Sequence, residues 1–183
     1  MAAPPATHTR SVLLPGGARC RVPRHVQRID VRSTHGWQLR LGQPTRFFSD
    51  SLFGGPRPAL AAAVKALRQR LREQPAPTGL HRVASRGKQN GLPAGISGPI
   101  LRRRADRRSH ECHFSVLLPR WGAPPKRRSV YIANERTWSA DKYHDALDRA
   151  ILLRAEAEAL CQIAADTAAR ATARRLRPAA VAR

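Results

Sequence analysis

The chain has 183 residues, of which 42% are hydrophobic, and its 34 lysines and arginines outnumber its 12 aspartates and glutamates, for a formal net charge of +22. This length fits one domain or two small ones, and such a charge opposes compaction through self-repulsion unless a polyanion offsets it. No stretch approaches the apolar length of a membrane-spanning helix, and three widely spaced cysteines (Cys20, Cys112 and Cys161) argue against a disulfide framework and for a reducing compartment.

Residues 1–25 are rich in Pro, Ala, Gly and Arg and show no hydrophobic periodicity. Such a composition is typical of a flexible segment, so we interpret residues 1–25 as a disordered basic tail. The segment has no apolar run like that of a signal peptide, and Pro and Gly interrupt the amphipathic helix that a transit peptide needs. We therefore expect a cytoplasmic, nucleoid-associated protein.

Residues 26–74 predict a first folded unit of three short strands and one helix. Ile29 and Val31 alternate with charged residues, the run WQLRLG places Trp37 with Leu39 and Leu41, and TRFFSD follows as a third strand. A helix from about Arg57 to Glu73 carries an apolar stripe at helical spacing, formed by Leu60, Ala63, Val64, Leu67 and Leu71. This helix laid over the sheet would bury both apolar faces.

The same order of elements returns in residues 95–169, after a Pro-, Gly- and polar-rich linker at 75–94. The runs PILRRRAD, HECHFSVLLP and RRSVYIAN predict three strands, and alternation in the middle one places Cys112, Phe114, Val116 and Leu118 on one face and His113, Ser115 and Leu117 on the other. We therefore predict an α+β fold of two tandem units, each a three-stranded antiparallel sheet packed on one C-terminal α-helix, with flexible basic tails.

The last helix begins with clear signals. Ser139 is a good N-cap, Asp141 in the first turn complements the helix dipole, and Trp138 is placed for a hydrophobic staple. The apolar stripe consists of Tyr143, Leu147, Ala150, Ile151, Ala157, Leu160 and Ala164. The helical pattern extends toward Arg175, and we interpret residues 170–183 as a basic C-terminal tail.

Charge separates along the second unit. Residues 99–131 hold nine Arg and Lys against two Asp and Glu, whereas residues 139–169 hold three against six. A positive sheet beneath a negative helix predicts that a polyanion approaches the sheet side. A sheet presented to the major groove can recognise bases through side chains that alternate along each strand.

The motif GISG-x-x-LRRR, the alternating strand after it and SVYIA before an Ala-rich helix resemble the Apetala-type (ethylene-response-factor) DNA-binding domain, and FFSDSLFGGPRPALAAAV is a further echo in the first unit. Bacterial and phage-type relatives of that family share this pattern. The resemblance implies two tandem domains whose sheets enter the major groove. It implies DNA contacts by Arg28, Arg32, Trp37 and Arg40 in the first unit and by Arg102, Arg103 and Arg104 in the second, with Arg127 and Arg128 meeting phosphate.

Two of these positions have a second interpretation. Trp37 shares a strand face with Leu39 and Leu41, so a packing role is an equal alternative to a DNA contact. Alternation sends Arg103 to the side opposite Arg102 and Arg104. Because the middle strand of the second unit has His113 and Ser115 where the family pattern has Arg or aromatic residues, we expect base recognition to rest more on the first unit.

The sequence does not favour an enzyme or a metal protein. His110, Cys112 and His113 invite a zinc site, but a tetrahedral site needs four ligands, and alternation splits this set. There is no H-E-x-x-H motif, phosphate-binding glycine loop or nucleophile elbow. We expect no cofactor.

The expected function is binding of double-stranded DNA, as a transcriptional regulator or an accessory factor of a mobile element, with no membrane partner. Two alternatives stay open: a nonspecific RNA or DNA binder of the nucleoid type, and an interaction protein that forms a homodimer through the C-terminal helix.

Overall fold

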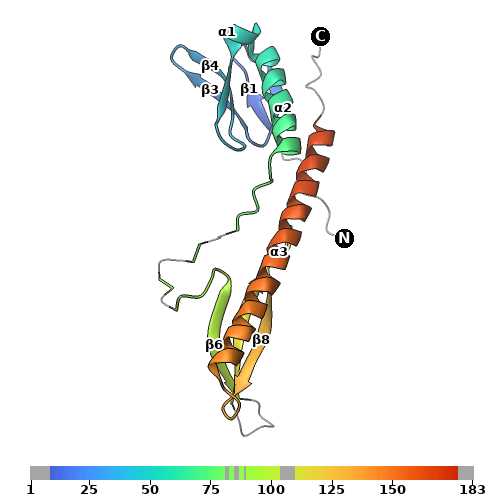
Figure 1. The fold of residues 1–183 in the computed structure, drawn as a ribbon. Coiled ribbons are helices and arrows are strands. Elements are labelled where there is room, and N and C mark those ends of the chain that lie inside the picture. Colours follow the sequence, from blue (N-terminus) through green and yellow to red (C-terminus); the bar gives the residue numbers. More distant parts are fainter. Residues whose placement is uncertain (1–8, 81–82, 85–86, 89, 104–109, 177–183) are drawn as a thin grey trace. The chain divides into compact units, whose positions relative to one another are not determined.

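The structure, a computed structural model, describes residues 9–80, 83–84, 87–88, 90–103 and 110–176 (Figure 1). The fold is α+β, with three antiparallel sheets and a long C-terminal helix. The chain divides into two compact units, Met1–Ala76 with Ala165–Arg183 and Pro77–Ala164, which we call the first and second units. Within the described ranges, no helix is both long and apolar enough to cross a membrane.

The predicted three-stranded sheet of the first unit is confirmed. Its strands β3 (Val26–Val31), β4 (Thr34–Leu39) and β5 (Arg46–Ser49) pair in antiparallel order. A short helix α1 (Asp50–Phe53) ends at Gly54, which has a left-handed φ of 75°, and α2 (Pro56–Glu73) follows with Pro in its first turn. The predicted stripe on α2 is buried at Leu60, Ala63, Val64 and Leu67, as its spacing requires.

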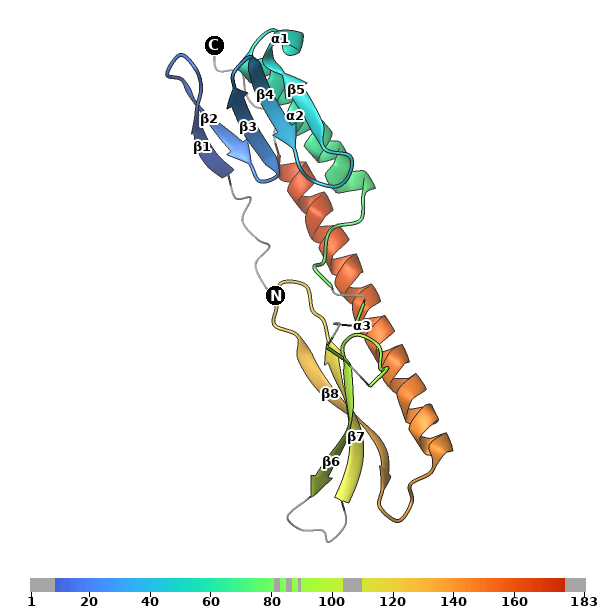
Figure 2. The same cartoon turned by 90° about the vertical axis from the view of Figure 1, so that its left-hand side faces the viewer.

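The interpretation of residues 1–25 as a disordered tail is wrong for the described part of that segment. Strands β1 (Thr9–Leu13) and β2 (Arg19–Pro23) form an antiparallel hairpin (Figure 2). Leu14 and Val22 are buried in the same core as α2, and Val12 and Cys20 pack against it. Pro and Gly in this segment build the turn between the strands, while the apolar residues supply one buried face.

The buried face of β3 is not the one that its alternation suggests. The register pairs Val26 with Leu39 and Arg28 with Trp37, so these side chains share the side that faces α2. Val31 is 60% exposed on the opposite side. Because Trp37 and Leu39 bring more apolar area than Ile29 and Val31, the side of β4 that holds them takes the core.

The second unit contains β6 (Ile96–Arg103), β7 (His110–Leu118) and β8 (Lys126–Asn134) in an antiparallel sheet, covered on one face by α3 (Ala140–Arg175) (Figure 1). Cys112, Phe114 and Val116 of β7 are buried against Ala146 and Ala150 of α3. The predicted inward face of the middle strand is therefore confirmed. The described residues of 77–94 form no helix or strand.

The start of α3 matches its sequence signals. The Lys142 backbone N–H donates to Ser139 Oγ at 3.3 Å, and the rings of Trp138 and Tyr143 lie 5.8 Å apart, which forms the predicted cap and staple. The predicted apolar stripe of α3 is only partly buried, since Leu160 in this stripe is 67% exposed.

The interpretation of residues 170–183 as a tail is wrong up to Leu176. The helix continues to Arg175, and Leu176 is buried in the core of the first unit. Residues 177–183 lie outside the described ranges.

Candidate nucleic-acid interface

The expected DNA contact by Trp37 is wrong. Its side chain is fully buried in the first core, with 0% exposure, and its indole Nε1–H donates to the Pro56 carbonyl at 2.7 Å. A buried Trp needs such a partner for its N–H. Trp37 thus ties β4 to the start of α2, which is the packing alternative.

Arg28 is likewise held by the protein and not presented to a ligand. Its side chain is 7% exposed and forms ion pairs with Asp30 at 2.7 Å and Asp50 at 2.6 Å. Its guanidinium carbon lies 5.2 Å from the centre of the Trp37 ring. The Asp50 hydrogen bond is the main cause that raises the pKa of Arg28. Two carboxylates already neutralise the charge of Arg28, so the structure gives it a role in the fold and does not support the expected DNA contact.

Arg32 and Arg40 are exposed, but they lie at opposite ends of the β3–β4 hairpin. Arg32 occupies the turn after β3 with a φ of 49°, and Arg40 follows β4 and donates from Nε to Gln38 Oε1 at 2.8 Å. These two arginines do not form one surface with Arg28 and Trp37.

The uncovered side of the first sheet carries few charges. The register places Gln27, Gln38 and Phe47 in one cross-strand row and Ile29, Gly36 and Ser49 in the next. The Phe47 ring lies over Gly36, since a Cβ there would come within 2.6 Å of Phe47 Cζ. An aromatic and amide surface of this kind does not match an arginine-rich DNA-binding strip.

The second sheet has a different uncovered side. Its helix-facing side contains Phe114 and Val116, so the register assigns their neighbours along each strand to the other side. We call this side the open face; it consists of Ser97, Ile100, Arg102, Glu111, His113, Ser115, Leu117, Arg127, Ser129, Tyr131 and Asn134. Cross-strand pairing aligns Ser97 with Ser115 and Ser129, and Ile100 with His113 and Tyr131.

The arginines predicted in the second unit are split between the two sides of the sheet. Arg102 pairs with Glu111 and Arg127 with Leu117, so both belong to the open face. Arg103 pairs with His110 and Arg128 with Val116, which assigns them to the helix side, where both are exposed. Arg104 lies outside the described residues.

Two aromatic rings mark the centre of the open face. The His113 ring meets the Tyr131 ring edge-on at 5.3 Å, and its Nε2 lies 3.4 Å from Glu111 Oε2. Among the described residues, His113 Nδ1 is buried without a hydrogen-bond partner. Sequence reasoning did not include His113, Tyr131 or Ser129 in the site, although strand alternation placed each of them opposite the core.

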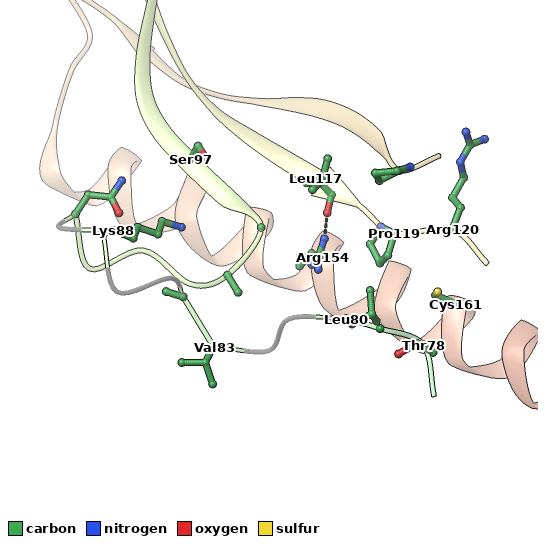
Figure 3. A pocket seen from close by; sticks show the side chains of 17 residues that line it. Thr78, Leu80, Val83, Lys88, Ser97, Leu117, Pro119, Arg120, Arg154 and Cys161 are labelled. Atoms are coloured by element: carbon green, nitrogen blue, oxygen red, sulfur yellow. Dashed lines mark hydrogen bonds between the residues drawn. The ribbon is translucent and has the colours of Figure 1, made fainter. Parts of the chain in front are cut away.

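A cavity of about 860 Å³ in the second unit is lined in part by Ser97 and Leu117 of the open face, and its lining also includes Lys88, Arg120, Arg154 and Cys161 (Figure 3). Arg154 Nη1 donates to the Leu117 carbonyl, and Nε donates to Glu158 Oε1 at 2.6 Å. Lys88 Nζ donates to the backbone carbonyls of Pro93, at 2.7 Å, and Ile96. Burial lowers the pKa of Lys88. Lys88 and Arg154 thus hold backbone carbonyls in place.

The zinc hypothesis finds no support in the geometry. Within the parts of the chain that the structure describes, no three His, Cys, Asp or Glu side chains gather as metal ligands. His110 Nδ1 is bonded to Glu135, and Cys112 is buried in the core, where desolvation raises the pKa of its thiol.

Comparison with known proteins adds no assignment. No family model, curated protein or solved structure matches this chain.

Proposed function

We propose that this protein binds double-stranded DNA through the open face of its second sheet. The observation that carries the proposal is the placement of Arg102 and Arg127 on the side that α3 does not cover, around the hydrogen-bonding side chains of His113, Ser129 and Tyr131. The helix α3, which holds more acidic than basic residues between 139 and 169, lies on the opposite side of the sheet. The charge of the unit therefore favours approach of a polyanion to the open face.

The chemistry of this face suits a duplex. Arg102 and Arg127 have planar forks that pair with phosphate oxygens or with the O6 and N7 atoms of guanine. Hydroxyl groups of Ser129 and Tyr131 can donate to or accept from base edges. Because β-ribbons and sheets enter the major groove, the cross-strand rows offer side chains at a regular spacing.

The order of elements supports a specific form of this proposal. A three-stranded antiparallel sheet followed by a helix occurs twice along the chain, as expected for two tandem domains that resemble the ethylene-response-factor type. We propose that the second unit makes the main contact, as part of a transcriptional regulator or an accessory factor of a mobile element. The first unit adds exposed arginines such as Arg32 and Arg40.

The test compares two double variants with equal charge loss on the same strands. Arg102→Ala with Arg127→Ala removes the open-face arginines, and Arg103→Ala with Arg128→Ala removes their neighbours on the helix side. We expect the first variant to bind duplex DNA at least about tenfold more weakly and to flatten the salt dependence by about 0.9 per lost phosphate contact. In the control variant, the decrease in the logarithm of the affinity should be less than half as large. Equal losses of affinity in both variants would mean that the arginines attract DNA through overall charge and not through the open face, which contradicts the proposal.

Competition separates DNA recognition from nonspecific binding. Selection of duplexes from a random pool should yield a preferred sequence. The complex with this duplex should persist in the presence of excess random duplex and excess RNA. A complex displaced equally by random duplex or RNA would favour the nucleoid-type alternative.

The exposed apolar residues of α3 favour a second candidate, assembly of a homodimer through this helix. Leu152 and Leu160 are 61% and 67% exposed and lie on one side of the helix, eight residues apart. Light scattering of the full chain tests this candidate. A dimer that dissociates in Leu152→Glu with Leu160→Glu would support it, and a monomer at all concentrations would exclude it.

A further inference from the structure

We propose that the first unit contains a separate binding site for a phosphate group, in a basic pocket where the β1–β2 hairpin meets the β3–β4 sheet. The cavity has a volume of about 350 Å³ and is lined by Thr9, Arg10, Pro23, Arg24, His25, Val26, Gln27 and Arg40. This site lies in a different unit from the open face and does not depend on it.

Four cationic or titratable side chains line this pocket, and none of its described lining residues carries a carboxylate. Arg10, Arg24 and Arg40 come from β1, the β2–β3 turn and the residue after β4, so strand pairing brings together positions up to 30 residues apart. Among the described residues, none of these three guanidinium groups is bonded to an aspartate or glutamate. Arg28 on the same sheet has two such partners. The pocket therefore holds positive charge that the protein leaves unneutralised.

The backbone around the pocket is held in place before any ligand arrives. The Arg40 N–H donates to the His25 carbonyl at 2.8 Å, which closes the end of the β3–β4 hairpin. Arg10 Nη2 donates to the Val26 carbonyl at 3.2 Å and fixes the hairpin to β3. His25 adopts a left-handed φ of 76° in the two-residue Arg24–His25 turn, so this tight turn directs two consecutive side chains to the pocket.

The ligand class follows from this charge and size. Guanidinium forks match phosphate oxygens, and a cavity of about 350 Å³ is near the small end of the range for small-molecule sites. Such a volume accommodates a phosphate ester with its sugar and exceeds what a bare anion fills. The shared chemistry is a sugar phosphate, either within a nucleic-acid strand or as a free small molecule.

Arg24→Ala in the full chain is the central test, because Arg24 makes no hydrogen bond or ion pair within the described residues and its loss should leave the fold intact. Arg21→Ala is the matched control, since Arg21 is an exposed arginine on the adjoining strand β2 outside the pocket. Binding of inorganic phosphate and of ribose 5-phosphate is measured by calorimetry at low chloride, and thermal unfolding verifies that both variants are folded.

We expect Arg24→Ala to weaken ribose 5-phosphate binding by about tenfold, and Arg21→Ala to change it less than twofold. Duplex binding at several salt concentrations then separates the two sources. A slope that is flatter by about 0.9 in Arg24→Ala alone assigns the pocket to a strand phosphate, whereas an unchanged slope assigns it to a free sugar phosphate.

Arg24→Ala and Arg21→Ala could change the affinity for both phosphate ligands and the salt slope of duplex binding equally. That result would overturn the proposed phosphate site. Absence of phosphate binding together with an unchanged duplex slope would also overturn it. Neither result bears on the open face of the second sheet, whose own test uses Arg102 and Arg127. The two proposals therefore fail independently.

Discussion

The Arg28 guanidinium holds the Asp50 carboxylate through two hydrogen bonds, from Nη1 to Oδ1 at 2.8 Å and from Nη2 to Oδ2 at 2.6 Å. Their side chains are 7% and 15% exposed. This pair joins β3 to the start of α1. The same guanidinium also forms an ion pair with Asp30 and lies over the Trp37 ring. An arginine expected at the DNA surface is therefore part of the framework of the first unit.

Loss of this pair should destabilise the first unit. Arg28→Ala leaves Asp50 without its charged partner, and loss of hydrogen bonds to a charged group in this partly buried pair costs about 1.5–3 kcal/mol. Urea denaturation should show this loss, while the exposed Arg32→Ala should change the free energy of unfolding by less than about 0.5 kcal/mol. Equal stability of the two variants would contradict a structural role for Arg28.

Acid should weaken the same network through Asp30. The Arg28 hydrogen bond is the main cause that lowers the pKa of Asp30, with a smaller part from His35. A folded pKa below the unfolded value of about 3.9 stabilises the protein above that pH, and this contribution is lost as the pH falls through the folded pKa. In urea denaturation at pH 7, 5 and 3, Asp30→Asn should be less stable than the original chain at pH 7 and 5, and the difference should shrink at pH 3. A difference independent of pH would contradict this linkage.

Trp37→Phe should separate packing from DNA binding. The change removes the hydrogen bond from the indole N–H to the Pro56 carbonyl, which is worth about 0.5–1.5 kcal/mol, and leaves unfilled volume in the first core. Thermal denaturation should show this loss, while duplex affinity, measured well below the unfolding transition, should stay within twofold. A large loss of duplex affinity in a fully folded variant would indicate that Trp37 contributes to DNA binding.

Gly95→Ala should destabilise the second unit for two reasons. Gly95 has a φ of +80°, and a Cβ there would lie 2.7 Å from the Arg154 guanidinium carbon. Gly122 has a similar φ of +69° but open space around it, so Gly122→Ala isolates the backbone cost of about 1–2 kcal/mol. Denaturant unfolding should show a larger loss for Gly95→Ala than for Gly122→Ala. Equal losses would mean that Arg154 simply moves aside.

His25 should report on the charge of the basic pocket. Burial, and then the charge of Arg24, lowers the pKa of His25. Its neutral form therefore supports stability fully above about pH 6.5, and this support declines as the pH falls. In an NMR titration, Arg24→Ala should raise the pKa of His25, and Arg21→Ala should leave it unchanged. A pKa equally insensitive to both substitutions would place Arg24 too far away to act.

Local patterns in the sequence predicted β3 to β5, α2, β6 to β8 and α3 in their order, together with several local details, but not the β1–β2 hairpin or α1. Period-two and period-3.6 patterns predicted both three-stranded sheets and the helices after them, and the Ser139 cap and the Trp138 staple match the start of α3. Alternation also identified the inward face of β7 and separated Arg102 from Arg103. These features depend on neighbours close in the chain, so local chemistry is sufficient to specify them.

Contacts between elements far apart in the sequence set the buried side of β3 and the residues that meet across the chain. Alternation gives β3 two faces, but the pairing of Arg28 with Trp37 selects the charged one for the core side, because β4 contributes the larger apolar area. The β1–β2 hairpin gains its stability from contacts with a core built mainly by later residues. Arg10, Arg24 and Arg40 become one pocket for the same reason: strand pairing, which no local pattern encodes, brings them together.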